Sequence, residues 1–321
     1  MSKKFPSILI ALIFAIFPSL SNGQNIDEAL QISNEIFGSK LIKDEAYGAF
    51  QRGHYLTALS LALPKAEAGD AASQTLIGEI YANGLGVAKN YALASHWYKQ
   101  ADENGDISAS FALAMLYQQG QGVPKNRKYA AELFKKAAKK NHREAKYNLA
   151  LLHIEGIYAE PNVVEAADLM REAANAGLVE AQYDYGIMLL DGVGVAPDLT
   201  LGALYIKQAA SAGLSEAQVE FGTLLYFGKG VERNLEQSIL WYETAANTGN
   251  PVAQNRLAKL YAVGEGVELN LQTAAVWRAL ARLSGLNDVE LDKLLISISK
   301  EDLDLAENKA RFWPQEPPKE N

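Results

Sequence analysis

Residues 179–214 read VEAQYDYGIMLLDGVGVAPDLTLGALYIKQAASAGL, and residues 215–250 read SEAQVEFGTLLYFGKGVERNLEQSILWYETAANTGN. The two stretches have glycine, alanine and apolar residues at the same positions, 36 residues apart. Comparing the chain with itself extends this 36-residue period without an insertion from residue 71 to residue 286. A fixed period of this length is typical of proteins that stack one small structural unit. The six units start at Ala71, Ile107, Arg143, Val179, Ser215 and Pro251.

Each unit is predicted to form two helices. In the first, apolar residues recur at unit positions 3, 7, 10 and 11, which is close to helical spacing. Position 14 is always glycine, as at Gly192, and ends this helix because glycine accepts a left-handed backbone. Position 20 is always Asn or Asp, as at Asp198, and can accept backbone N–H groups where the second helix begins. Position 31 is always alanine, and position 35, Gly or Asn, ends the second helix.

The pattern resembles the Sel1-like repeat family, a relative of the tetratricopeptide repeat. The resemblance rests on several coinciding positions: a GxGV loop in five units, a tryptophan at position 27 in three units and a tyrosine at position 11 in three units. It implies an all-α fold, a right-handed α-solenoid superhelix of helix pairs. It also implies a scaffold that binds proteins and is not an enzyme. The tryptophans at position 27 are expected in the core, and they are Trp97, Trp241 and Trp277.

The N-terminus has the pattern of a secretory signal peptide. Lys3 and Lys4 precede an apolar run at residues 8–17, and the small residues Ser21 and Gly23 follow. Pro18 makes the run too short to cross a bilayer, which needs about 20 apolar residues. We therefore expect cleavage of residues 1–23, no membrane span afterwards and a location in the bacterial periplasm, with secretion as the alternative.

The remaining chain divides around the repeats. We expect an N-terminal extension at 24–43, a shortened tetratricopeptide-like capping helix pair at 44–70, the six repeats at 71–286, and C-terminal capping helices with a Pro-rich tail at 287–321. Ser299 and Asp302 have the spacing of a capping box before the last helix. Stacked repeats need such ends, because each unit buries its apolar face only against a neighbour.

Composition and motifs exclude several classes of function. The chain has 30 basic and 38 acidic residues, a net charge of −8, whereas a nucleic-acid-binding protein needs an excess of cations. It has no cysteine, and no two of its four histidines have the helical spacing of a metal pair. The GxGV loops recur at the structural period and lack the Lys-Ser or Lys-Thr of a phosphate loop. We therefore predict no catalytic residue, no cofactor and no metal.

One feature exceeds what the repeat needs. Positions 5, 9 and 12 share a helix face away from the core, and related repeats line their concave groove with it. In the middle units this face is largely apolar, and we call it the apolar stripe: Phe111, Met115, Tyr147, Leu151, Ile154, Tyr183, Ile187, Leu190, Val219 and Tyr226. Acidic residues flank it, above all Glu144, Glu180 and Glu216 at position 2, with Glu155, Asp184, Asp191 and Glu220 nearby.

The stripe has two interpretations that the sequence leaves open. An exposed apolar surface with an acidic margin suits a basic, amphipathic protein or peptide. Alternatively, superhelical curvature packs these side chains against the next repeat. The first interpretation predicts a periplasmic adaptor in cell-envelope regulation or assembly. A secreted factor that engages host proteins, and an enzyme that binds peptidoglycan or antibiotics, are the alternatives.

Overall fold

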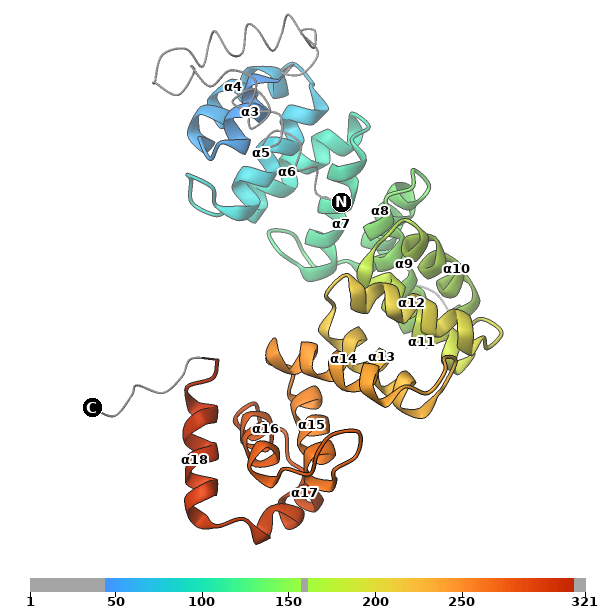
Figure 1. The fold of residues 1–321 in the computed structure, drawn as a ribbon. Helices are drawn as coiled ribbons and strands as arrows, with labels where there is room; N and C mark the ends of the chain where they lie inside the picture. Colours follow the sequence, from blue (N-terminus) through green and yellow to red (C-terminus); the bar gives the residue numbers. More distant parts are fainter. Residues whose placement is uncertain (1–43, 157–160, 315–321) are drawn as a thin grey trace, which may run out of the picture. The chain divides into compact units, whose positions relative to one another are not determined.

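The computed structural model describes residues 44–156 and 161–314, and every regular element within them is a helix (Figure 1). The all-α prediction is confirmed for this part of the chain. The expected signal peptide at 1–23, the extension at 24–43 and residues 315–321 of the expected tail lie outside it. The described residues divide into two compact units, and each unit is treated by itself.

The first unit extends to Ala109 and includes Gln121–Val123, and its described residues from Asp44 on form α3 to α6 and the start of the next helix. Consecutive helices pack on one another, and alanines of α4 lie against Ile77 and Ile80 of α5. α3 and α4 form a short helix pair where the sequence predicts one, joined through Gly53, whose φ is 80°. The helices are α3 (Glu45–Gln51), α4 (Tyr55–Glu67), α5 (Ala71–Asn83) and α6 (Tyr91–Glu103).

The second unit begins within α7 (Ile107–Gln119), at Ser110, and resumes at Pro124. Each helix from α8 to α15 packs against the next one in the chain, as expected for stacked helix pairs, and α16 packs against α18. The helices are α8 (Arg127–Ala138), α9 (Arg143–Glu155), α10 (Val163–Asn175), α11 (Val179–Asp191), α12 (Leu199–Ser211), α13 (Ser215–Phe227), α14 (Leu235–Asn247), α15 (Pro251–Val263), α16 (Leu271–Leu283), α17 (Val289–Leu294), η2 (Leu295–Ser297) and α18 (Lys300–Arg311).

The predicted caps are present. In all six repeats the position-20 side chain accepts a backbone N–H three residues on, as Asp198 does from Leu201 at 2.9 Å. Gly192 closes α11 with a φ of 69°, in the left-handed region. The second glycine of that loop, Gly194, touches the preceding repeat, since a Cβ there would overlap the carbonyl oxygen of Val163. The GxGV loop therefore both ends a helix and packs closely against the preceding repeat.

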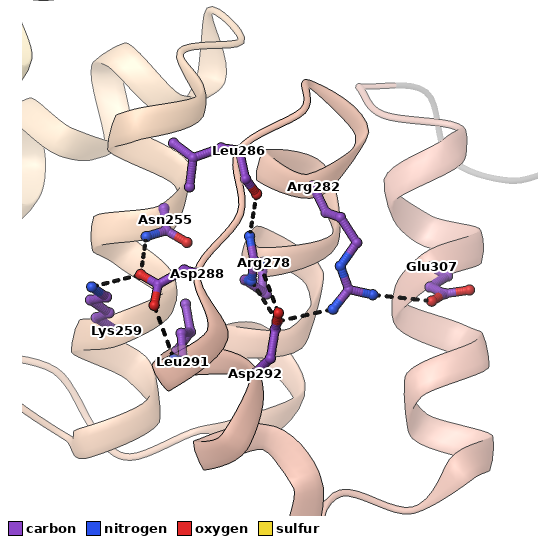
Figure 2. A network of polar contacts seen from close by, with 9 residues as sticks. All are labelled: Asn255, Lys259, Arg278, Arg282, Leu286, Asp288, Leu291, Asp292 and Glu307. Atoms are coloured by element: carbon purple, nitrogen blue, oxygen red, sulfur yellow. Dashed lines mark hydrogen bonds and ion pairs between the residues drawn. The ribbon is translucent and has the colours of Figure 1, made fainter.

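A network of polar contacts fastens the C-terminal helices to the last repeat (Figure 2). Arg278 of α16 is 2% exposed and donates to both carboxylate oxygens of Asp292 in α17, at 2.7 and 2.9 Å, and to the carbonyl of Leu286. Asp288, the N-cap of α17, accepts from Asn255 and Lys259 of α15 at 2.7 and 2.6 Å. These contacts replace the next repeat, which would otherwise cover α15 and α16.

Candidate binding surface

The apolar stripe comes from the first helices α7, α9, α11 and α13, and its members differ in exposure. Leu190 and Val219 are 8% and 7% exposed and belong to the core between repeats. Ile154 is the most open, at 39%. The other members are half-buried: Phe111, Met115, Tyr147, Leu151, Tyr183, Ile187 and Tyr226. The accessible part of the stripe is therefore smaller than the sequence suggests, because it does not include Leu190 and Val219.

Several stripe residues are half-buried because they also contact the next repeat. The Tyr147 hydroxyl of α9 donates to Asp184 Oδ2 of α11 at 2.9 Å, and the Tyr226 hydroxyl of α13 donates to Glu265 at 2.6 Å. Tyr183 and Ile187 pack against the core cluster that contains Phe221. These side chains thus stabilise the stack and remain partly accessible to solvent.

The carboxylates beside Tyr183 raise the pKa of neighbouring groups. Burial and the neighbouring Glu180 raise the pKa of Asp184, although the hydrogen bond from Tyr147 opposes the rise. Burial, Glu220, Asp184 and Glu216 raise the pKa of Tyr183. The hydroxyl of Tyr183 therefore stays protonated at neutral pH and remains a hydrogen-bond donor next to a concentration of negative charge.

Most of the acids beside the stripe have no basic partner, whereas Glu144 has two. Across residues 44–156 and 161–314, no lysine, arginine or histidine forms an ion pair with the five carboxylates of α11 and α13, which are Glu180, Asp184, Asp191, Glu216 and Glu220. Glu144 is different, because Arg143 lies 2.8 Å and His142 3.3 Å from its carboxylate. The acidic margin is thus uncompensated beside Tyr183 and neutralised at the start of α9.

A hollow lies beside α12, away from the apolar stripe, and the sequence interpretation missed it. It encloses about 690 Å³ between α12, α13 and the loop before α14, and Leu201, Leu204, Lys207, Phe221 and Arg233 help to line it. Leu204 is 50% exposed at a position that the repeat turns to solvent. Its signal was the pair Leu201 and Leu204, three residues apart on the polar side of the predicted second helix.

The described residues offer little for metal chemistry. Among them, no group of three His, Asp or Glu side chains could hold an ion. His153 is 7% exposed in the core of its repeat, with Glu165 3.6 Å from Nε2. No helix in the described ranges is long and apolar enough to cross a membrane.

Tandem helix pairs, each packed on its neighbours along the chain, define an α-solenoid, the architecture of repeat scaffolds. The family model of the Sel1 repeat matches six consecutive segments: 71–106, 107–142, 143–178, 179–214, 215–250 and 251–283. The chain belongs to the Sel1 repeat family. The segments start at the six residues where the sequence period starts.

Two solved structures illustrate the relationship. A Sel1 repeat protein from Oxalobacter formigenes is 31% identical, with a TM-score of 0.66, over 74% of this chain and 94% of that one. The protein c5321, a protective antigen present in uropathogenic Escherichia coli strains, is 23% identical, with a TM-score of 0.73. That match covers 89% of this chain and 64% of c5321, so it supports the fold alone. A search of curated proteins gave no match.

Proposed function

We propose that this chain is a non-enzymatic adaptor that binds a basic, amphipathic segment of another protein along the exposed edge of the apolar stripe. Sel1 repeats generally serve as non-catalytic scaffolds for protein–protein binding. The observation that carries the finer proposal is the uncompensated acidic margin around Tyr183. Four carboxylates without a basic partner lie beside half-buried tyrosine and isoleucine side chains. A partner that supplies both cations and apolar groups satisfies this surface.

The proposed location is the periplasm, in regulation or assembly of the cell envelope. Its support is the pattern from Lys3 to Gly23, with an apolar run between a basic start and a small-residue exit. N-terminal sequencing of the protein recovered from periplasmic extracts is expected to begin at or near Gln24. An N-terminus at Met1 in a membrane pellet would refute export by cleavage. Recovery from the culture medium would favour the alternative, a secreted factor that engages host proteins.

Differential capture tests the binding site. The wild-type chain and the variant Tyr183→Ala are used as bait in the same periplasmic extract, with Leu204→Ala as the matched control. Leu204 is 50% exposed on α12 and lies outside the stripe. A partner retained by wild type and by Leu204→Ala, and lost with Tyr183→Ala, supports the proposal. A partner lost equally with both variants, or with Leu204→Ala alone, argues for another surface.

A further inference from the structure

The helix α8 and its flanks carry a concentration of positive charge that the other repeats lack. Residues 125–143 hold eight Lys and Arg residues and one acid, Glu132. The equivalent stretches of the other five repeats hold one or two Lys and Arg residues each. Since all six repeats form the same helix pair, the fold does not need these cations. They stand out further because the chain has a net charge of −8.

Six of these lysines are exposed, and together they are defined here as the α8 patch: Lys125, Lys128, Lys135, Lys136, Lys139 and Lys140. The opposite side of α8 is buried through alanines, Leu133 and Phe134. At 100° per residue, Lys128, Lys135 and Lys139 fall on one side of the helix over about 16 Å, and one exposed acid, Glu132, lies between them. Side chains on one side of an exposed helix can contact one flat surface together.

Ion pairing does not account for Lys128, Lys135, Lys139 or Lys140, and the helix dipole does not account for Lys128. In the described parts of the chain, no carboxylate pairs with Lys128, Lys135, Lys139 or Lys140, whereas Arg127 and Arg143 are engaged by Glu155 and Glu144. Cations near the C-terminus of a helix are favoured by the dipole, which explains lysines in the last turn. Lys128 lies in the first turn, where the same dipole disfavours a cation.

The composition of the patch indicates the kind of partner. Specific protein interfaces are enriched in aromatic residues and arginine and depleted in lysine. From Pro124 to Arg143 no large apolar side chain is exposed, and the exposed cations are all lysines. Such a surface has no anchor to insert into a pocket. It fits an extended anionic surface that is recognised by charge density alone.

We propose that the α8 patch docks the protein on a bilayer of anionic phospholipids. This inference concerns a different face from the apolar stripe and does not depend on it. The acidic residues elsewhere are repelled by the bilayer, but salt screens charges beyond about 8–10 Å at physiological ionic strength. The net negative charge therefore orients the protein with α8 toward the lipid. Export, as proposed above, would place the chain beside bilayers and away from nucleic acid.

Vesicle sedimentation tests the proposal with the full chain. Vesicles of phosphatidylcholine containing phosphatidylglycerol are compared with vesicles of phosphatidylcholine alone. The apolar run at residues 8–17 is the same in every variant, and its contribution is measured on the neutral vesicles. Wild type is expected to bind the anionic vesicles more tightly, and the binding is expected to weaken as salt rises. The test variant replaces Lys128, Lys135, Lys139 and Lys140 with glutamine.

The control removes the same four charges from exposed lysines elsewhere: Lys99, Lys229, Lys300 and Lys309. A lysine near an anionic surface contributes about fivefold to partitioning, so the test variant is expected to bind at least tenfold more weakly, and the control within twofold of wild type. Equal losses in both variants would show a net-charge effect and overturn the proposal. The proposal would also be overturned if wild type showed no salt-sensitive binding to vesicles. It would likewise be overturned if wild type bound duplex DNA more tightly than vesicles and the four glutamine substitutions abolished that DNA binding.

Discussion

The ring of Tyr98 in α6 lies directly against the backbone of Gly78 in α5, so that a Cβ on Gly78 would sit 2.5 Å from Cε1 of the ring. The hydroxyl of Tyr98 donates to Glu79 at 2.9 Å. Tyr242 crosses Gly222 in the same way and bonds to Thr223 at 3.1 Å. A tyrosine that reaches position 9 must cross position 8, and only glycine leaves room for it.

Gly78→Ala is therefore expected to destabilise the protein by about 1–3 kcal/mol, the usual cost of overpacking a core. Elsewhere in a helix the same change would stabilise by about 0.5–1 kcal/mol. Urea denaturation measures the change in the free energy of unfolding, and the double variant Gly78→Ala with Tyr98→Leu provides the control. Because leucine is smaller than tyrosine, the double variant should recover most of the stability that Gly78→Ala loses. A higher midpoint for Gly78→Ala alone would show that the ring is free to move aside.

The buried pair of Arg278 and Asp292 gives a second prediction. Arg278 occupies unit position 28, where the earlier repeats bury an uncharged side chain: Tyr98, Phe134, Met170, Ile206 and Tyr242. Asp292→Asn should destabilise the C-terminal helices by about 1–3 kcal/mol, because the guanidinium loses a charged partner. Joining this change to Arg278→Met should restore much of the stability, since no buried guanidinium is then left without a charged partner.

Lys293→Gln is the matched control for this pair, since it breaks an ion pair with Glu290 on the same helix. Both side chains of that pair are exposed, at 64% and 81%, so the expected change is below about 0.5 kcal/mol. Protection of α17 and α18 amides from hydrogen exchange is the measurement. Equal effects of Asp292→Asn and Lys293→Gln would contradict the role assigned to Arg278.

Acid should loosen the same region. Hydrogen bonds from Lys259, Asn255 and the Leu291 backbone hold the pKa of Asp288 far below its usual range, and Arg278 and Arg282 lower the pKa of Asp292. A carboxyl whose pKa is lower in the folded state stabilises the fold fully above its unfolded pKa, about 3.9. That contribution is lost as the pH falls from there toward the folded pKa.

Amide protection in α17 and α18, corrected for intrinsic exchange, should thus fall below about pH 4. It should fall less in α11 and α12, which have no such pair of carboxylates at an end of the stack. The variant Asp288→Asn with Asp292→Asn should have low protection and little pH dependence. A steep acid transition that survives in this variant would place the responsible carboxylates elsewhere.

Sequence reasoning succeeded where one residue acts within its own repeat. The Asn and Asp caps and the glycine helix ends are read from the period, because each depends on local backbone geometry. Contacts between repeats were harder to foresee. The burial of Leu190 and the bond from Tyr147 to Asp184 depend on the rotation of one repeat against the next, which a period does not encode. Arg278 could have been noticed as a charge at an apolar position.

The final prediction concerns the apolar stripe and separates its two roles. Tyr183→Ala should weaken partner binding by at least about 1 kcal/mol, as the loss of a buried aromatic anchor does. It should also lower stability, since Tyr183 packs against the cluster around Phe221. The fold should survive, because Tyr183 is half-buried and is not one of the buried residues that form that cluster. Circular dichroism gives the folded fraction, and binding is expressed per folded molecule.

Charge at the margin should act on the rate of association. Glu180→Gln with Glu216→Gln should slow association more than it speeds dissociation, and raising salt should shrink the difference, because exposed charges steer a basic partner over long distances. Glu236→Gln with Glu301→Gln, both exposed outside the stripe, is the control.

Suppose instead that Tyr183→Ala unfolds the protein while binding per folded molecule stays normal. The stripe would then be core between repeats, and the hollow at Leu204 and Lys207 would become the surface to test.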